Sequence, residues 1–100
     1  MQKTVNLNFN MGLYNEAGEL IKDGETGARV LARALLQSVG ADESEVLKYF
    51  SWSQQLMKDG VLTLDEADSR KLHKFVAENK NMYIIAKGPL LTEINKAKFE

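Results

Sequence analysis

The chain has 100 residues, with 13 Lys and Arg against 14 Asp and Glu, and no cysteine. This length indicates one domain, 1–100, with a single hydrophobic core. The absence of cysteine excludes disulfides and thiolate metal sites and is compatible with a reducing compartment. The formal charge of −1 argues against nucleic acid as a partner, because nucleic-acid-binding domains usually carry a basic face.

Residues 1–24 predict a β-hairpin. Its first strand alternates apolar with polar residues, which places the apolar ones on one face. The alternating apolar residues are Val5, Leu7, Phe9 and Met11. Residues 15–18 form a turn and 19–22 a returning strand, and the apolar face of this hairpin is expected to pack on helices. The start of the chain has no continuous apolar run, so neither a signal peptide nor a membrane span is expected.

Residues 28–99 predict a bundle of about four short helices. The first, about 28–39, is apolar all round except for a narrow stripe formed by Arg29, Arg33 and Gln37. Such a helix is typically central and covered on several sides, either within the chain or by a second copy. Because cyclic dimers are the commonest oligomers, we expect a homodimer.

The second helix is predicted at about 43–58. Asp42, with Glu45 three residues later, resembles a capping box, and Ser44 is a rival cap. One face of the helix is expected to be buried and consists of Val46, Tyr49, Phe50, Ser53, Leu56 and Met57. Trp52 lies at the edge of this face and Leu47 lies outside it.

The segment 55–66, QLMKDGVLTLDE, resembles the second half of a calcium-binding EF-hand loop. With Gly60 at the sixth position, Glu66 falls at the twelfth, but the first and third ligand positions hold Gln55 and Met57, where calcium requires carboxylate oxygens. A turn explains more of these residues. Gly60 suits the left-handed position after a helix, and Thr63 with Glu66 predicts a capping box that starts the next helix.

The third helix is predicted at about 64–78, and the last begins at Pro89, which suits a first helical turn. Residues 82–86 are compatible with a short strand or with the approach to that helix. The residues expected to be buried are Leu64, Ala67, Leu72, Phe75, Val76, Leu90, Leu91 and Ile94. The predicted fold is therefore α+β and mainly α, with an N-terminal β-hairpin packed on a bundle of about four short helices.

Candidate catalytic residues are scarce. His73 is the only histidine and is expected to face solvent without an orienting partner, and the glycines have no phosphate-loop spacing. We therefore expect no enzymatic activity, no cofactor and no metal. Trp52, Tyr49 and Tyr83 form the candidate protein interface, because aromatic side chains dominate interface energetics. Core packing is the alternative for each of them.

Four phrases in this order, NEAGEL, LARALLQ, LTLDEADSRKLHKFV and YIIAKGPLLTEI, resemble small uncharacterised proteins encoded in tailed phages and prophages. Pro89 departs from that pattern, which has a polar residue after the glycine. The resemblance implies a non-enzymatic protein in the cytoplasm of a bacterial host, either an assembly accessory or an inhibitor of a host system. The expected function is thus protein interaction. The alternative is a small-molecule or nucleotide binder, with a degenerate calcium loop at 55–66 as its least favoured version.

Overall fold

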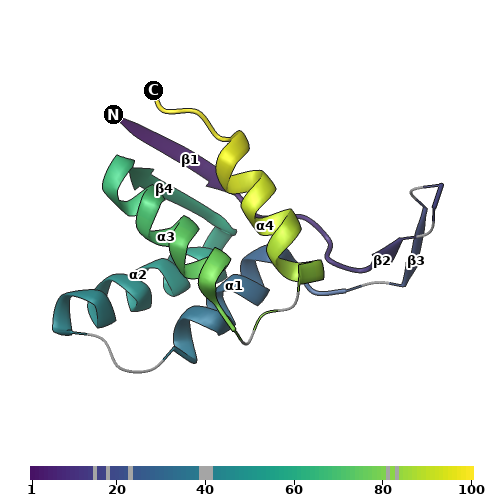
Figure 1. Cartoon of the computed structure of the whole chain (residues 1–100), viewed down its shortest axis with the longest axis horizontal. Helices are drawn as coiled ribbons and strands as arrows, with labels where there is room; N and C mark the ends of the chain where they lie inside the picture. Colours follow the sequence, from purple (N-terminus) through teal and green to yellow (C-terminus); the bar gives the residue numbers. More distant parts are fainter. Residues whose placement is uncertain (15, 18, 23, 39–41, 81, 83) are drawn as a thin grey trace.

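The computed structural model describes residues 1–14, 16–17, 19–22, 24–38, 42–80, 82 and 84–100 (Figure 1). The fold is α+β and mainly helical, with an antiparallel hairpin near the N-terminus and a helical bundle, as predicted. The elements of the described chain are β1 Gln2–Asn6, β2 Leu13–Tyr14, β3 Leu20–Lys22, α1 Gly27–Leu36, α2 Glu43–Asp59, β4 Val61–Asp65, α3 Glu66–Glu78 and α4 Ile84–Lys96.

The strand pairing differs from the prediction. β1 is antiparallel to β4, with Val5 opposite Leu62, and β4 occupies residues that were predicted to form a turn and the start of the third helix. The alternation of VLTLD in β4 matches that of β1, so the two strands together bury one face, which consists of Lys3, Val5, Leu62 and Leu64. The local pattern of Thr63 and Glu66 resembled a helix cap, and local patterns do not predict strand pairing between segments about 60 positions apart in the sequence.

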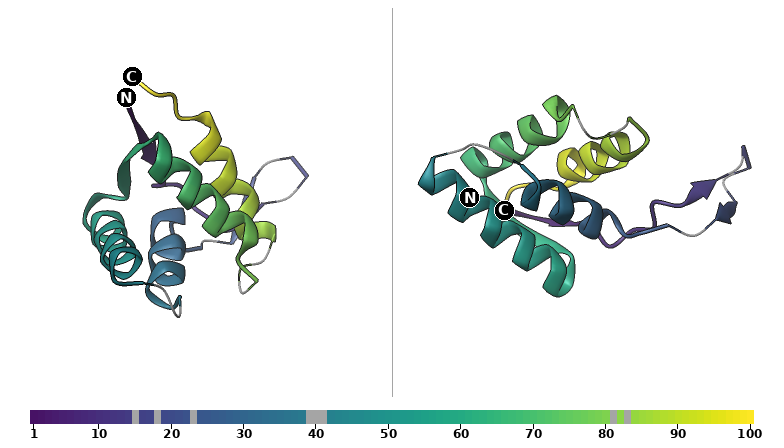
Figure 2. Two further views of the ribbon diagram at one scale, coloured as in Figure 1. Left: turned by 60° about the vertical axis from the view of Figure 1, so that its left-hand side comes forward. Right: turned by 90° about the horizontal axis from the view of Figure 1, so that it is seen from below.

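The predicted returning strand pairs elsewhere. β3 is antiparallel to β2, with Leu13 opposite Lys22. This short β2–β3 hairpin projects away from the helices, whereas β1 and β4 lie against them (Figures 1 and 2). The first predicted strand therefore divides, and its buried residues Val5 and Leu7 belong to the core.

Helix α1 is the central helix that its composition predicts. Four of its apolar side chains are almost completely buried, and they are those of Ala28, Leu31, Ala32 and Leu35. It packs on α2 and α4. Its first two backbone N–H groups donate hydrogen bonds to carbonyls of the segment that follows β1: Gly27 to Phe9 and Ala28 to Leu7, both at 2.9 Å. A Cβ atom at Gly27 would lie 2.5 Å from the Phe9 ring, so a larger residue there would displace that ring.

Both predicted ends of α2 are confirmed. The Asp42 carboxylate accepts hydrogen bonds from the backbone N–H of Glu45 at 2.9 Å and from the Ser44 hydroxyl at 2.7 Å, so Asp42 and not Ser44 is the cap. At the other end Gly60 has φ of 74°, the left-handed conformation expected of it. A Cβ atom there would lie 1.9 Å from the side-chain oxygen of Asn8.

The predicted capping box at the start of the third helix is wrong. Thr63 is an exposed strand residue opposite Thr4, and the N-cap of α3 is Asp65, which accepts a 2.7 Å hydrogen bond from the Asp68 N–H. Of the residues expected inside this helix, Leu72 and Val76 are buried and Phe75 is half-buried. Leu64 is buried as part of β4, and Ala67 is exposed.

The last helix begins at Ile84, five residues before Pro89, so Pro89 lies inside α4. Residues 84–86 form its first turn, so this part of the segment 82–86 is helical and not a short strand. The helix buries Leu90 and Ile94 as expected, and Leu91 is half-buried. The two ends of the chain lie side by side, where the N–H of Glu100 donates to the Gln2 carbonyl at 2.8 Å (Figures 1 and 2).

Candidate functional site

The buried face of α2 is rotated from the predicted one. Tyr49, Trp52 and Leu56 are buried, with Ser53 beside them, against α1 and β4. Val46 and Phe50 belong to the same predicted face, yet they are exposed, as is Met57. The apolar sector of α2 spans more than half a turn, and its neighbours cover only the side centred on Trp52 and Leu56. Part of the sector therefore stays in solvent.

Four exposed apolar residues lie on one side of α2, and we call them the α2 apolar row. They are Val46, Leu47, Phe50 and Met57. Each retains between 54% and 61% of its surface exposed to solvent. At 100° per residue they fall within a stripe roughly 100° wide, which also contains Glu43 and Gln54. A stripe of exposed apolar residues is a candidate contact surface.

Helix α1 borders the row on one side. Leu36, which is 47% exposed, lines a hollow of about 380 Å³ together with Met57 of the row, Arg29 and Arg33. The Arg33 guanidinium donates two hydrogen bonds to the Glu25 carboxylate and thereby lowers the pKa of that carboxyl group. The apolar surface thus continues from α2 onto α1, with arginines at its border.

The two ends of the α2 apolar row carry opposite charge. Asp42 and Glu43 lie at the N-terminal end of α2. Lys58 lies in its last turn and Arg29 lies beside Met57, whereas Asp59, the last residue of the helix, lies on the side opposite Phe50. Acidic groups at the start of a helix and basic groups at its end also complement the helix dipole. The row is therefore apolar in the middle and electrostatically polarised along its length.

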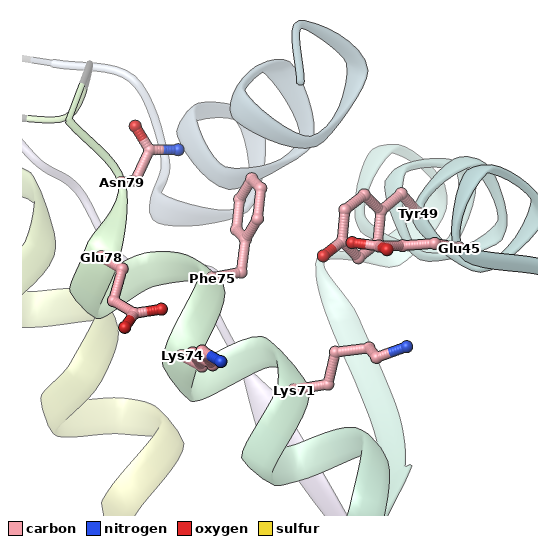
Figure 3. A pocket seen from close by; sticks show the side chains of 7 residues that line it. All are labelled: Glu45, Tyr49, Lys71, Lys74, Phe75, Glu78 and Asn79. Atoms are coloured by element: carbon pink, nitrogen blue, oxygen red, sulfur yellow. The ribbon is translucent and has the colours of Figure 1, made fainter. Parts of the chain in front are cut away.

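A second candidate site lies between α2 and α3 (Figure 3). This α2–α3 pocket has a volume of about 440 Å³, and it is lined by Glu45, Tyr49, Lys71, Lys74, Phe75, Glu78 and Asn79. Figure 3 shows the Phe75 ring and the Tyr49 ring on facing sides, with the amines of Lys71 and Lys74 on α3 at the rim. The two ammonium groups can pair with an anionic group of a small ligand, and the carboxylates of Glu45 and Glu78 in the same lining balance their charge.

Tyr49 is held in its neutral form at this pocket. Burial raises the pKa of its phenol, and the hydrogen bond to the Glu45 carboxylate raises the pKa further, because the phenol must keep its proton to donate it. In Figure 3 the phenol oxygen lies next to the Glu45 carboxylate. The group at this position is thus a hydrogen-bond donor and not a base.

The aromatic residues predicted as an interface lie mostly inside. Trp52 is 4% exposed and Tyr49 is 9% exposed, and their rings stack with centroids 5.7 Å apart. Phe75 meets Tyr49 edge-on at 5.2 Å. Trp52 and Tyr49 therefore adopt the alternative role, core packing, and Tyr83 lies outside the described residues. The exposed aromatic of α2 is Phe50, which its helical periodicity had assigned to the core.

The segment with EF-hand resemblance is not a loop. Gln55 and Met57 are helical, α2 continues to Asp59, and β4 follows at once, so the backbone cannot wrap around an ion there. Over the described residues, no cluster of three or more His, Asp or Glu has the proximity that metal binding requires. His73 is half-buried on α3 and is not among the residues that line the α2–α3 pocket.

Comparison of the chain with protein-family models, with curated proteins and with solved structures found no match. Within the described ranges, none of the helices combines the length and the apolar character that a membrane crossing needs.

Proposed function

We propose that this chain is a non-catalytic protein-interaction module and that its contact surface is the α2 apolar row with Leu36 of α1. The observation that carries the proposal is the exposure of Phe50 and its three neighbours on a helix that already buries another face in the core. Covering apolar surface of this kind is favourable by about 25 cal/mol per Å². An aromatic side chain at its centre is the type of residue that contributes most to protein interfaces.

The proposed biological setting is a phage-related one, in which the module serves as an assembly accessory or inhibits a host system in the bacterial cytoplasm. The sequence resemblance to small phage and prophage proteins supports this setting. The homodimer expected from the sequence belongs to the same proposal, since a self-contact would cover the same surface.

Site-specific photo-crosslinking in cells that express the protein tests the contact surface. A photoreactive phenylalanine analogue replaces Phe50 in one variant and Gln55 in the other, because Gln55 is an exposed α2 residue outside the row. We expect light-dependent protein adducts at position 50 and far fewer at position 55. An adduct with a different protein should be suppressed by excess wild-type protein and not by excess Phe50→Gln protein. An adduct between two copies of the chain should persist in excess wild-type protein, because each added copy is itself a partner. Equal adducts at both positions, or none at position 50, would overturn the proposal.

The alternative function, binding of a small anionic molecule or nucleotide, is favoured by one observation, the paired lysines of the α2–α3 pocket. A ligand that binds the folded state raises the melting temperature. A rise with ATP or inorganic phosphate that Lys71→Gln abolishes would support this alternative.

A further inference from the structure

Three of the four residues of the α2 apolar row, Leu47, Phe50 and Met57, share one heptad line of the helix, and the other two positions of that line are polar. Five positions along α2 follow one another at intervals of four, three, four and three residues, and they are Glu43, Leu47, Phe50, Gln54 and Met57. This heptad spacing keeps side chains on one line, which suits the side chains of a facing helix better than a flat surface or a strand. The partner that fits the row is therefore another helix.

The row is also complementary to itself when reversed. The midpoint between Glu43 and Lys58 falls beside Phe50, and these two charged residues lie about 22 Å apart along the helix axis, at about 1.5 Å per residue. An antiparallel copy of α2 centred on Phe50 places Glu43 opposite Lys58 at both ends. A parallel copy would place like charges together, so the charges select the antiparallel orientation.

The two charged residues are available for such contacts. Both are exposed, and among the residues that the structure describes neither has an ion-pair partner within its own chain. Arg29, which borders Met57, adds positive charge at the end that would receive Glu43 of the second copy.

We propose that the surface of the proposed function is covered by a second copy of this chain, as a two-fold symmetric dimer in which α2 packs antiparallel on α2. This inference rests on the proposed function and adds the symmetry, the orientation and the residue contacts of the homodimer. Phe50 packs on Phe50 at the axis, Leu47 and Met57 flank it, and Leu36 of α1 widens the apolar contact. Each end of the helix pair holds a Glu43–Lys58 ion pair between the two copies. A two-fold interface uses one surface twice, which the reversed complementarity of this row satisfies.

The mass of the wild-type protein in solution gives the first test. Sedimentation velocity over micromolar to millimolar concentrations should show a transition from 11.2 kDa to twice that mass. Phe50→Gln should weaken the dimer at least about thirtyfold, since a central aromatic is lost from both sides of the axis. Gln55→Ala, which changes an exposed residue outside the row, should leave the dissociation constant unchanged. A protein of 11.2 kDa at all concentrations, or a dimer insensitive to Phe50→Gln, would overturn the inference.

Charge reversal tests the orientation. Glu43→Lys and Lys58→Glu should each weaken the homodimer about tenfold, because each replaces two attractive pairs with two repulsive ones. The double variant should regain the affinity, and an equimolar mixture of the two single variants should form heterodimers in preference to either homodimer. Glu66→Lys and Lys96→Glu are the controls, since they alter exposed charges in a first and a last helical turn away from the row. Single variants that weaken the dimer without rescue in the double variant would exclude the antiparallel arrangement.

The crosslinking experiment separates failure of this inference from failure of the proposed function. Adducts at position 50 between two copies of the chain support both. Adducts at position 50 with a different protein only, together with a monomer in sedimentation, overturn the dimer and leave the interaction module standing. The absence of specific adducts at position 50 overturns both.

Discussion

The Nζ atom of Lys3 donates a 2.7 Å hydrogen bond to the backbone carbonyl of Ile94, across 91 positions of the sequence. Lys3 is only 7% exposed, and its ammonium lies 5.0 Å from the centroid of the Phe99 ring. The last carbonyls of a helix lack intrahelical partners, and a cation beside them also complements the helix dipole. This bond therefore joins the first strand to the last turn of α4.

Removal of that ammonium should weaken the fold. Lys3→Met retains the apolar stem but leaves the Ile94 carbonyl without this donor, and we expect the free energy of unfolding to fall by about 1–3 kcal/mol. Lys80→Met, at an exposed position, should change it by less than about 0.5 kcal/mol. Urea unfolding followed by circular dichroism measures both. Equal effects would mean that the Lys3 bond contributes nothing specific.

The observed start of α3 predicts which residue caps it. Asp65→Ala removes the acceptor of the Asp68 N–H and should lower the free energy of unfolding by about 1 kcal/mol. Thr63→Val removes the hydroxyl but keeps a β-branched residue in β4, so it should have little effect. If Thr63→Val proved the more damaging change, the helix would begin two residues earlier in solution.

The acid titration of Asp42 follows from its two hydrogen bonds. The Glu45 N–H and the Ser44 hydroxyl both stabilise the charged carboxylate, so they lower its pKa below the ordinary value of 3.8. A lowered folded-state pKa means that the carboxylate stabilises the fold above that ordinary value and that this contribution is lost as the pH falls through the folded-state pKa. Carboxyl NMR titration should place Asp42 below 3.8, and Ser44→Ala should move its pKa upward. An unchanged pKa in Ser44→Ala would show that this hydroxyl bond does not form in solution.

Mutation of two nearby aromatic residues of α2 should have very different effects on the free energy of unfolding. Trp52→Ala removes a side chain that is 4% exposed and should lower the free energy of unfolding by about 3–5 kcal/mol. Phe50→Gln removes an exposed ring and should change the stability of the monomer by less than about 1 kcal/mol. Unfolding at low protein concentration, where a dimer would dissociate, gives the monomer values. A comparable loss for Phe50→Gln would place Phe50 in the core of the monomer and remove it from the contact surface.

Local signals in the sequence determined that the helices exist and where α2 begins and ends, but not where α3 and α4 begin. The Asp42 cap, the left-handed Gly60 and the apolar circumference of α1 depend on interactions within a few residues or on the composition of one helix, so periodicity and capping rules predicted them. The α+β fold class followed from the same local patterns.

The tertiary structure decided which strands pair and which side of α2 is buried. β4 exists because β1 pairs with it across the chain, and a local capping signal in the same segment pointed to helix instead. Likewise, Phe50 and Trp52 both lie in the broad apolar sector of α2, and periodicity cannot tell which part of that sector the neighbouring elements cover. In the folded chain α1 and β4 pack on α2, with Trp52 buried and Phe50 exposed. The candidate contact surface is thus a property of how the elements pack and not of any one segment.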